Sequence, residues 1–397
     1  AAIVECVAAQ GDLAIRALTE QIDGVQLSQL EVSAEEIAWA SEQVSEQVKQ
    51  AIEVAMKNIS AFHEAQMPSE VRVETQRGVV CVQRPVAIQR VGLYIPGGTA
   101  PLFSTVLMLA LPAKIAGCRE IILCTPTNKQ GRVASEVLYA ASRCGVSRIF
   151  KVGGAQAVAA LAYGTASVPK VDKIVGPGNA FVAEAKRQVF GKVSIDMIAG
   201  PSEILVIADG KSNPAYVAAD LLSQAEHDKM ASAVLVTDSE ALALQVQKEI
   251  EQQLKTLPRE EIARTSIENN GKIIVADNFE DVLAVANEIA PEHLELCVDN
   301  PFDYLDKIQN AGSIFMGRYC PEALGDYFAG PNHTLPTSGT ARFSSPLSVD
   351  DFVKKTQYSY FTKGALAKVG EKVAFFAEKE GLSAHARSAT IRLEDCK

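Results

Sequence analysis

The feature that most constrains the fold is a repeated alternation of short apolar runs and longer amphipathic segments between residues 91 and 316. Short runs rich in Val, Ile and Leu predict buried strands, and apolar residues three and four apart predict helices. Strands that alternate with helices form βαβ units and a parallel sheet. The pattern pauses near residues 199–202 and then starts again, so we expect an α/β protein with two doubly wound, Rossmann-like domains. The expected strands are 91–95, 120–124, 148–152, 173–175, 204–208, 233–237, 272–275, 294–298 and 313–316.

The segments that flank this alternation have other patterns. Residues 1–66 have helical spacing in two amphipathic stretches, and we expect His63 near the end of the second stretch to be a surface residue. Residues 71–88 alternate around Gly78, which predicts a hairpin. A helix is expected over about 364–380, because Gly381 follows it as a helix stop. The chain should therefore have a helical N-terminal segment and a helical C-terminal tail.

Composition excludes several classes of function. The 397 residues carry a net charge of -10, and no basic tract is interleaved with aromatic residues, which argues against nucleic acid as a partner. No apolar run approaches the ~20 residues that a membrane span needs. The eight cysteines include no C-x-x-C pair, which argues against a thiolate zinc site. Scattered thiols are typical of a reducing compartment, so we expect a cytoplasmic protein.

Two segments contain side chains that are typical metal ligands. Gln224 and His227 lie three residues apart near the end of a helix that begins at Pro214, so both leave the same helix face. They form either half of a metal site or a polar helix end. Asp326, in a loop rich in glycine and proline, is either a ligand or a turn aspartate. Histidine and oxygen ligands without thiolates suit an open zinc site, and they also accept manganese or iron.

Two further patterns are typical of catalysis and of cofactor binding. Glu292 and His293 are adjacent at a helix-to-strand junction, where they form either an acid–base pair or an exposed loop pair. Three loops that follow expected strands are rich in glycine: 95–98, 152–155 and 175–179. Helix N-termini at strand ends bind phosphates, so these loops either hold a phosphate-bearing ligand or are tight turns. None of them is a complete G-x-G-x-x-G fingerprint.

Over its whole length the chain resembles the histidinol dehydrogenase family, whose members complete histidine biosynthesis. The matching blocks are VGLYIPGGTAPLFSTVLMLALPAKIAG, GGAQAVAALAYGT, KIVGPGNAFVAEAK, DMIAGPSEILVIAD, ADLLSQAEHD, APEHLEL, GSIFMGRYCPEALGDYFAGPNHTLPTSG and EGLSAHARSA. The resemblance implies two successive oxidations of L-histidinol to L-histidine through a bound histidinaldehyde. Each oxidation passes a hydride to NAD. One Zn²⁺ per subunit is implied, which holds the imidazole and amine of the substrate.

The resemblance also implies a role for individual residues. His293 matches the base that takes the alcohol proton, and Glu292 matches the group that activates water for the second step. The implied zinc ligands are Gln224, His227, Asp326 and His385. The implied substrate contacts are Ser202, Gln224, His227, His293, Asp326, Glu380 and His385. The implied NAD contacts are Tyr94, Gln156 and Asn179, each in or beside one of the three glycine-rich loops.

The family is a homodimer whose C-terminal tail crosses over, so Glu380 and His385 would complete the active site of the partner. The implied domains are 1–93 with 204–347 for most metal and catalytic residues, 94–203 for NAD, and 348–397 for the swapped tail. Asp228 stands where glycine is usual, and the family usually has a longer N-terminus. Two alternatives remain: a relative that oxidises another amino- or hydroxy-alcohol, and a non-catalytic, zinc-dependent nucleotide-binding or interaction module in which Glu292 and His293 are dispensable.

Overall fold

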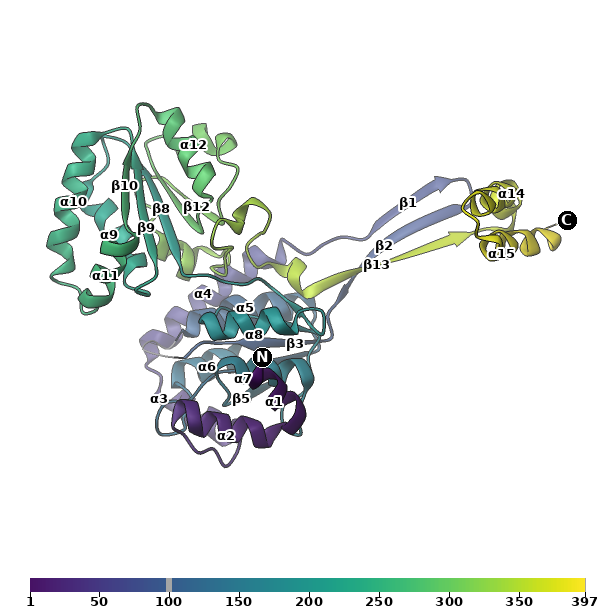
Figure 1. The fold of residues 1–397 in the computed structure, drawn as a ribbon, viewed down its shortest axis with the longest axis horizontal. Helices are drawn as coiled ribbons and strands as arrows, with labels where there is room; N and C mark the ends of the chain where they lie inside the picture. Colours follow the sequence, from purple (N-terminus) through teal and green to yellow (C-terminus); the bar gives the residue numbers. More distant parts are fainter. Residues whose placement is uncertain (98–101, 397) are drawn as a thin grey trace. The chain divides into compact units, whose positions relative to one another are not determined.

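The computed structural model describes residues 1–97 and 102–396, so Gly98 of the first glycine-rich loop lies outside the described residues. The chain divides into two compact units (Figure 1). Unit 1 consists of Ala1–Gln66 and Ile88–Phe352, and unit 2 consists of Met67–Ala87 and Val353–Lys397. Unit 1 contains two parallel sheets of five strands each, and unit 2 contains a three-stranded antiparallel sheet.

The first sheet of unit 1 has the strand order β5-β4-β3-β6-β7. Chain order runs outward from β3 to β5 and then returns to β6 on the other side of β3. This reversal makes the β3/β6 boundary the topological switch point, where ligands bind in doubly wound folds. The elements are β3 (Arg90–Tyr94), α5 (Phe103–Ala116), β4 (Glu120–Cys124), α6 (Ser135–Cys144), β5 (Arg148–Phe150), α7 (Gly154–Tyr163), β6 (Lys173–Val175), α8 (Ala180–Val189) and β7 (Ser194–Ile195).

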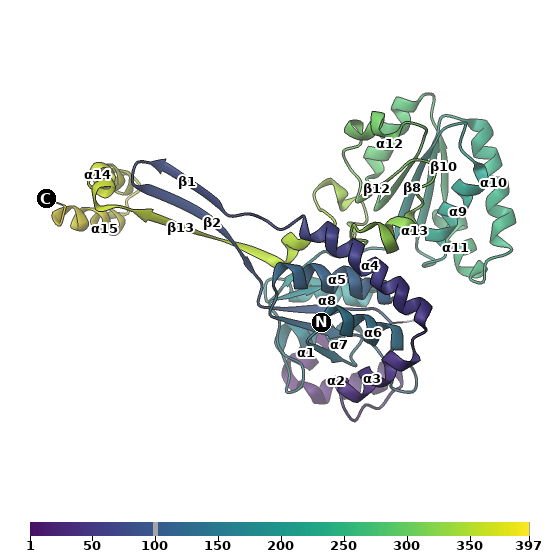
Figure 2. The ribbon, with the colours of Figure 1, turned by 180° about the vertical axis from the view of Figure 1, so that it is seen from behind.

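Four N-terminal helices cover this first sheet as outer layers. They are α1 (Ala2–Gln10), α2 (Asp12–Asp23), α3 (Ala34–Gln43) and α4 (Glu46–Glu64). Helices α1 and α2 pack on α7, whereas α3 packs on α6 and α4 runs along α5 (Figure 2). Helix α5 is buried on nearly all sides between this layer and the sheet, which explains its lack of an amphipathic pattern.

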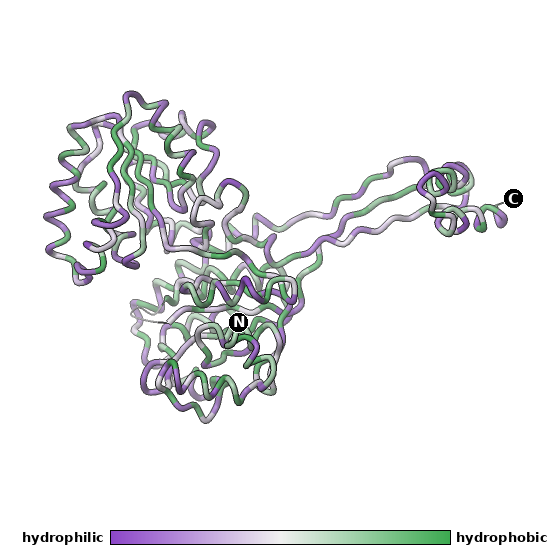
Figure 3. The backbone as a smooth tube through the Cα atoms, viewed as in Figure 1, coloured by the Kyte–Doolittle hydropathy of each residue, from purple (hydrophilic) through white to green (hydrophobic). Residues whose placement is uncertain are grey.

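The second sheet of unit 1 has the order β10-β9-β8-β11-β12. Central strand β8 sends Ile204 and Val206 into a core under α9, α10 and α11, and Leu205 and Ile207 into the core under α12. Burial on both faces explains its continuous apolar sequence (Figure 3). The elements are β8 (Glu203–Ala208), α9 (Pro214–Ala225), β9 (Ser232–Thr237), α10 (Glu240–Leu254), α11 (Glu260–Asn270), β10 (Lys272–Val275), α12 (Phe279–Ile289), β11 (His293–Cys297) and β12 (Ser313–Met316).

Short helical turns fill the remaining connections of unit 1. They are η1 (Pro301–Lys307), α13 (Glu322–Leu324), η2 (Gly325–Ala329), η3 (Thr340–Arg342) and η4 (Val349–Phe352). Asn332, which follows η2, donates a hydrogen bond from Nδ2 to the Met108 carbonyl on α5 (2.6 Å). The loop after the second sheet is thus attached to the layer of the first sheet.

Unit 2 combines a hairpin with the C-terminal segment. Its sheet has the order β1-β2-β13, and the elements are β1 (Val71–Gln76), β2 (Val79–Ala87), β13 (Val353–Phe361), α14 (Lys363–Lys379) and α15 (Ser383–Glu394). The two helices meet through Ala374, Ala377 and Ala386. Most of β13 is exposed, as are Phe375 and Phe376 of α14. Unit 2 on its own therefore buries little apolar surface.

The predicted fold class is confirmed, and two expectations differ from the structure. His63 is fully buried, because it lies on the packed face of α4, and its Nδ1 donates to the Ile59 carbonyl there (2.9 Å). The C-terminal tail is only partly helical, since it begins with strand β13, which completes the sheet of the hairpin. The first 66 residues pack on the first sheet. No helix among residues 1–97 and 102–396 is long and apolar enough to cross a membrane.

Candidate active site

The candidate site is built where two neighbouring strands of the second sheet begin. Strands β8 and β11 are parallel partners, so Glu203 and His293, their first residues, lie close together. The Glu203 N–H donates to Glu292 Oε2 (2.9 Å), and His293 Nδ1 donates to the Glu203 carbonyl (2.9 Å). Both Glu292 and His293 are buried. The adjacent acid and imidazole predicted from sequence are therefore held by one backbone segment.

This hydrogen bond determines the tautomer of His293. Because a carbonyl only accepts, Nδ1 carries the proton and Nε2 keeps its lone pair in the neutral ring. Nε2 lies 3.6 Å from Glu322 Oε1 and 3.8 Å from Asp326 Oδ1, and it has no hydrogen-bond partner among the described residues. Burial lowers the pKa of His293 to about 4, although its bond to Glu203 opposes this shift. The ring is thus neutral at pH 7, with Nε2 available to take a proton.

Gln224 reaches the same cluster from the last turn of α9, and its side chain is buried. Its amide satisfies three neighbours in one orientation. The oxygen then accepts from His293 Nδ1 (3.3 Å) and Glu203 N (3.1 Å), and the nitrogen donates to Glu322 Oε1 (3.0 Å). His227 lies in the turn that follows α9, and its side chain is exposed. Asp228 Oδ1 closes this turn by accepting from Met230 N (2.8 Å).

Asp326 lies in η2, and its side chain is largely buried. Burial raises the pKa of Asp326 to about 7. One ligand atom each of His293, Glu322 and Asp326 lies within 4.8 Å of the other two. Burial, opposed by the bond from Glu203, also raises the pKa of Glu292 well above its usual range, and the Glu203 and Asp326 carboxylates raise it further. Such crowding of acids favours a cation or bound protons.

Four acidic residues of this network were missed from sequence. Glu322, the first residue of α13, is buried, and its Oε2 has no hydrogen-bond partner within the described part of the chain. Its N–H donates to Glu295 Oε1 (2.8 Å), and Glu295 is hydrogen-bonded in turn to Asp220. Glu203 adds a fourth carboxyl. Only the spacing of four residues between Glu322 and Asp326 was a usable signal.

The predicted cofactor residues share the carboxyl edge of the first sheet. Tyr94 ends β3, and its hydroxyl oxygen accepts from Gly154 N (3.1 Å). Asn179 caps α8, because its Oδ1 accepts from Phe181 N (3.1 Å) and Val182 N (3.2 Å). Gln156 is buried in the first turns of α7, with Nε2 unpaired among residues 1–97 and 102–396. The Tyr94 proton and the Asn179 Nδ2 group likewise make no hydrogen bond within those residues, so the edge carries three donors.

The corresponding edge of the second sheet is closed by an arginine. Arg318 binds both carboxylate oxygens of Asp209 (2.8 and 2.9 Å) and the Cys297 carbonyl (2.9 Å). These contacts fill the carboxyl ends of β8 and β11, where a ligand would otherwise bind. The acid–base cluster instead lies at the opposite, amino ends of the same strands.

The remaining predicted residues lie outside this cluster. Ser202 directly precedes β8, and its carbonyl accepts from Ser232 N (3.0 Å). Glu380 follows α14 and His385 belongs to α15, so both are in unit 2, where their side chains are exposed. His333, which received no role from sequence, contacts Thr105 Oγ1 through Nε2 (3.3 Å).

Comparison with known proteins identifies the family. A profile described as histidinol dehydrogenase matches residues 1–393. Histidinol dehydrogenase of Halalkalibacterium halodurans is 53% identical over 393 residues, which are 99% of this chain and 93% of that protein. The enzyme of Syntrophotalea carbinolica is also 53% identical, over 100% of this chain and 92% of that protein.

Solved structures agree with these matches. The crystal structure of histidinol dehydrogenase from Elizabethkingia anophelis superposes with a TM-score of 0.95 at 43% identity, covering 99% of this chain and 91% of that one. An acetylating aldehyde dehydrogenase from Geobacillus thermoglucosidasius, with a TM-score of 0.54 and 13% identity over 91% of each chain, shares the fold alone. The chain therefore belongs to the histidinol dehydrogenase family of oxidoreductases.

Proposed function

We propose that this chain oxidises L-histidinol to L-histidine in two NAD-dependent steps through a bound histidinaldehyde, which are the last steps of histidine biosynthesis. Family membership supports the substrate. The observation that carries the chemistry is the buried Glu292–His293 pair, in which Nδ1 is bonded to the Glu203 carbonyl and Nε2 faces the Asp326 and Glu322 carboxylates.

His293 is the base of the first oxidation. As the alcohol carbon loses its hydride, the alcohol oxygen loses a proton, and Nε2 is the lone pair that takes it. The Glu203 carbonyl remains bonded to Nδ1 and stabilises the imidazolium that forms. Nearby carboxylates at 3.6 and 3.8 Å stabilise the same charge. The His293 ring is thus neutral at rest, and its protonated form is stabilised by these neighbours.

Glu292 activates water for the second oxidation. A carboxylate accepts a proton from water as the oxygen adds to the aldehyde carbon, and the hydrate then loses its hydride. The raised pKa of Glu292 favours the protonated carboxyl in the chain alone. A positive charge beside Asp326 would shift Glu292 towards the carboxylate, which is the form that acts as a base.

The residues fit a zinc ion. The crowded carboxyls are groups that a cation would stabilise, and zinc accepts nitrogen and oxygen ligands. The family resemblance supports Asp326, Gln224, His227 and His385 as the ligands, an assignment that leaves His293 Nε2 free for the proton. Bound zinc would supply the positive charge that holds the imidazole and amine of histidinol. Ser202, His293 and Glu380 are assigned as further substrate contacts.

The residues also fit NAD, which accepts the hydride in each step when it is bound. Tyr94, Gln156 and Asn179 offer donors at one sheet edge, beside the β3/β6 switch point. Oxygen acceptors of a dinucleotide match such donors, and the N-terminus of α8 favours its phosphates. We therefore assign residues 94–203 as the NAD-binding domain.

We further propose a homodimer in which unit 2 crosses to a second copy and brings Glu380 and His385 to the partner site. Strand β1 and nearly all of β13 are exposed, and a sheet that buries so little of its surface is marginally stable alone. Tyr360 is 60% exposed and Phe376 is 71% exposed, and a second copy would cover such side chains. The eight cysteines are all free thiols, which supports a reducing, cytoplasmic location.

The direct test is NADH formation from L-histidinol, counted per molecule of histidine formed. Two NADH per histidine are expected, and a chelator should stop the reaction until zinc is returned. Another amino alcohol at equal concentration is the matched control for the substrate. A faster reaction with that alcohol would contradict the assignment of histidinol, and no NADH from any alcohol would favour a binding module.

A further inference from the structure

A buried ion pair lies behind the third glycine-rich loop and has no part in the proposed chemistry. Lys186 of α8 and Asp196, which follows β7, form a salt bridge, and their side chains are 2% and 1% exposed. Asp196 Oδ2 accepts from Gly176 N (2.7 Å), and Lys186 Nζ donates to the Gly176 carbonyl (3.0 Å). The pair therefore binds both polar backbone groups of a single glycine.

Gly176 is a position where the backbone needs such support. Its φ of +128° is rarely adopted by residues with a side chain, and a Cβ atom there would collide with the Tyr94 carbonyl. Glycine has the largest conformational freedom to lose on ordering. Two hydrogen bonds to charged partners restrict that freedom and hold Gly176 in contact with the end of β3, where Tyr94 lies.

The other end of the loop is held by a cap. Asn179 accepts from the N–H groups of Phe181 and Val182, so the first turn of α8 is fixed to it. The segment from Gly176 to Asn179 is thereby anchored at both ends. A buried ion pair is no more stabilising than an apolar pair of similar size, so stability alone does not account for Lys186 and Asp196.

We propose that Lys186 and Asp196 are positioning residues that hold the Gly176–Asn179 loop in its cofactor-binding conformation. This inference rests on the proposed role of Tyr94 and Asn179 in binding NAD. The pair does not touch the cofactor. It acts through the backbone of Gly176, which packs against Tyr94 and lies three residues before Asn179.

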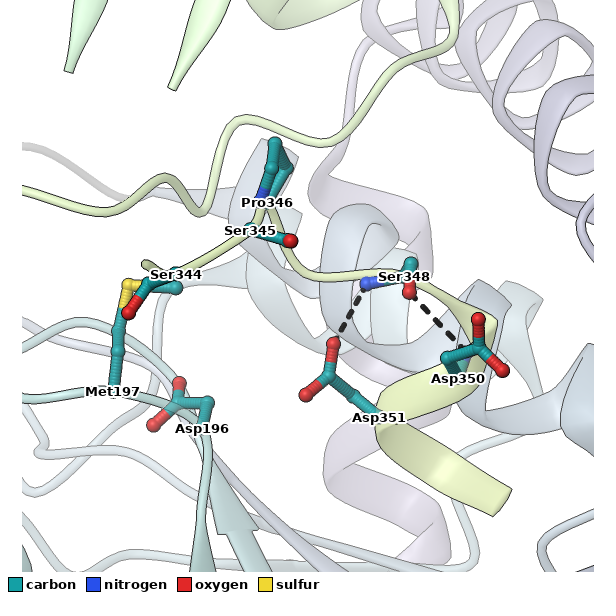
Figure 4. Close-up of a pocket in the computed structure, with 8 residues that line it drawn as sticks. All are labelled: Asp196, Met197, Ser344, Ser345, Pro346, Ser348, Asp350 and Asp351. Carbon is teal, nitrogen blue, oxygen red and sulfur yellow. Dashed lines mark hydrogen bonds between the residues drawn. The ribbon is translucent and has the colours of Figure 1, made fainter. Parts of the chain in front are cut away.

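The chain offers a matched control pair at the other end of β6, the strand that precedes the Gly176 loop. Lys173, at the opposite end of β6, binds Asp351 (3.0 Å) and is also buried. Asp196 and Asp351 line the same pocket of about 350 Å³ (Figure 4). There Asp351 Oδ2 also accepts from Ser348 N (3.0 Å). The Lys173–Asp351 pair resembles the first pair in chemistry and location, but it holds no glycine of the loop.

The test compares three double variants, each of which leaves no lone buried charge. Lys186→Met with Asp196→Leu removes both hydrogen bonds to Gly176. Lys186→Met with Asp196→Asn keeps an oxygen that can accept from the Gly176 N–H. Lys173→Met with Asp351→Asn is the control. NADH affinity is measured by fluorescence titration of the zinc-loaded protein, alongside the melting temperature and the KM for histidinol at saturating NAD.

The first variant should bind NADH about tenfold more weakly, as expected if the loop holds its binding conformation about a tenth of the time. The asparagine variant should lose less affinity, and the control and the histidinol KM should not change. A purely structural role instead predicts that affinity follows melting temperature across all three variants. A folded leucine variant that binds NADH like the wild type would overturn the proposal.

Two outcomes separate this proposal from the function on which it rests. A wild type that fails to bind NADH contradicts the proposed cofactor site itself. If the leucine variant does not fold, amide hydrogen exchange at Gly176, Gly178 and Asn179 of the asparagine variant gives the answer. Faster exchange there than in the control supports the positioning role, and equal exchange overturns it.

Discussion

Replacing Glu295 by glutamine tests the buried carboxyl network beneath the active site. Glu295 is 1% exposed, accepts from Glu322 N (2.8 Å) and is hydrogen-bonded to Asp220. Burial, and then the charge and hydrogen bond of Asp220, raise its pKa to about 9 from an ordinary value of 4.5. Glutamine imitates the protonated acid, because its oxygen can accept from Glu322 and its nitrogen can donate to Asp220.

The magnitude follows from the proton that the folded chain retains. Between pH 4.5 and pH 9 the unfolded chain loses the Glu295 proton and the folded chain keeps it, so unfolding becomes more favourable as the pH rises. The stabilisation that comes from the retained Glu295 proton is present in full below pH 4.5 and is lost by about pH 9. One proton changes the free energy of unfolding by about 1.4 kcal/mol per pH unit, or about 2.7 kcal/mol between pH 6 and pH 8.

We therefore expect Glu295→Gln to gain about 2.7 kcal/mol of stability over the wild type on going from pH 6 to pH 8. The assay is urea unfolding of the whole chain at pH 6 and at pH 8, followed by circular dichroism at fixed zinc concentration. The free energy of unfolding of Glu240→Gln, an exposed position on helix α10, should change with pH as that of the wild type does. If Glu295→Gln also runs parallel to the wild type, Glu295 is ionised in the folded chain and the buried proton is refuted.

Three further outcomes follow from the proposed site. His293→Asn should slow the first oxidation by about 10²–10⁴-fold, the usual contribution of a general base, and Glu292→Gln should mainly slow the second; single-turnover NADH formation separates the steps, and unchanged rates in both would remove the pair from the mechanism. Gly176→Ala should weaken NADH binding in a titration, because the new methyl group meets the end of β3 and the positive φ disfavours alanine; wild-type affinity would contradict this. Inactive His227→Asn and His385→Asn chains should regain activity when mixed and refolded, and no recovery would mean that each site is built from one chain.

Local sequence patterns predicted most of the strands of the molecule and the turns and helix starts that depend on neighbouring residues. Strand-helix alternation gave nearly every strand of both parallel sheets, because burial on two faces makes those strands continuous apolar runs. Strand β7, with only two residues, carried too little pattern to be recognised. The hairpin around Gly78 and the helix that begins at Pro214 were readable because turns and helix starts depend on neighbouring residues.

Part of the candidate site was also readable from sequence. Glu292 and His293 are adjacent in the sequence, whereas Gln224 and His227, expected on one helix face, are separated by the end of α9 at Ala225. The three glycine-rich loops follow strands, where phosphate sites are expected. These signals come from neighbouring residues, so they can be recognised without knowledge of the fold. The family resemblance then supplied roles that spacing alone left open.

What only the tertiary structure decided depends on contacts between distant segments. Glu322 and Glu295 are unremarkable in sequence, and they become important because α13 folds back over β11. The buried position of His63, the strand that begins the C-terminal tail and the packing of the N-terminal helices on the first sheet arise in the same way. A sequence pattern reports which face of an element is apolar, whereas the partner that covers that face is chosen by the whole chain.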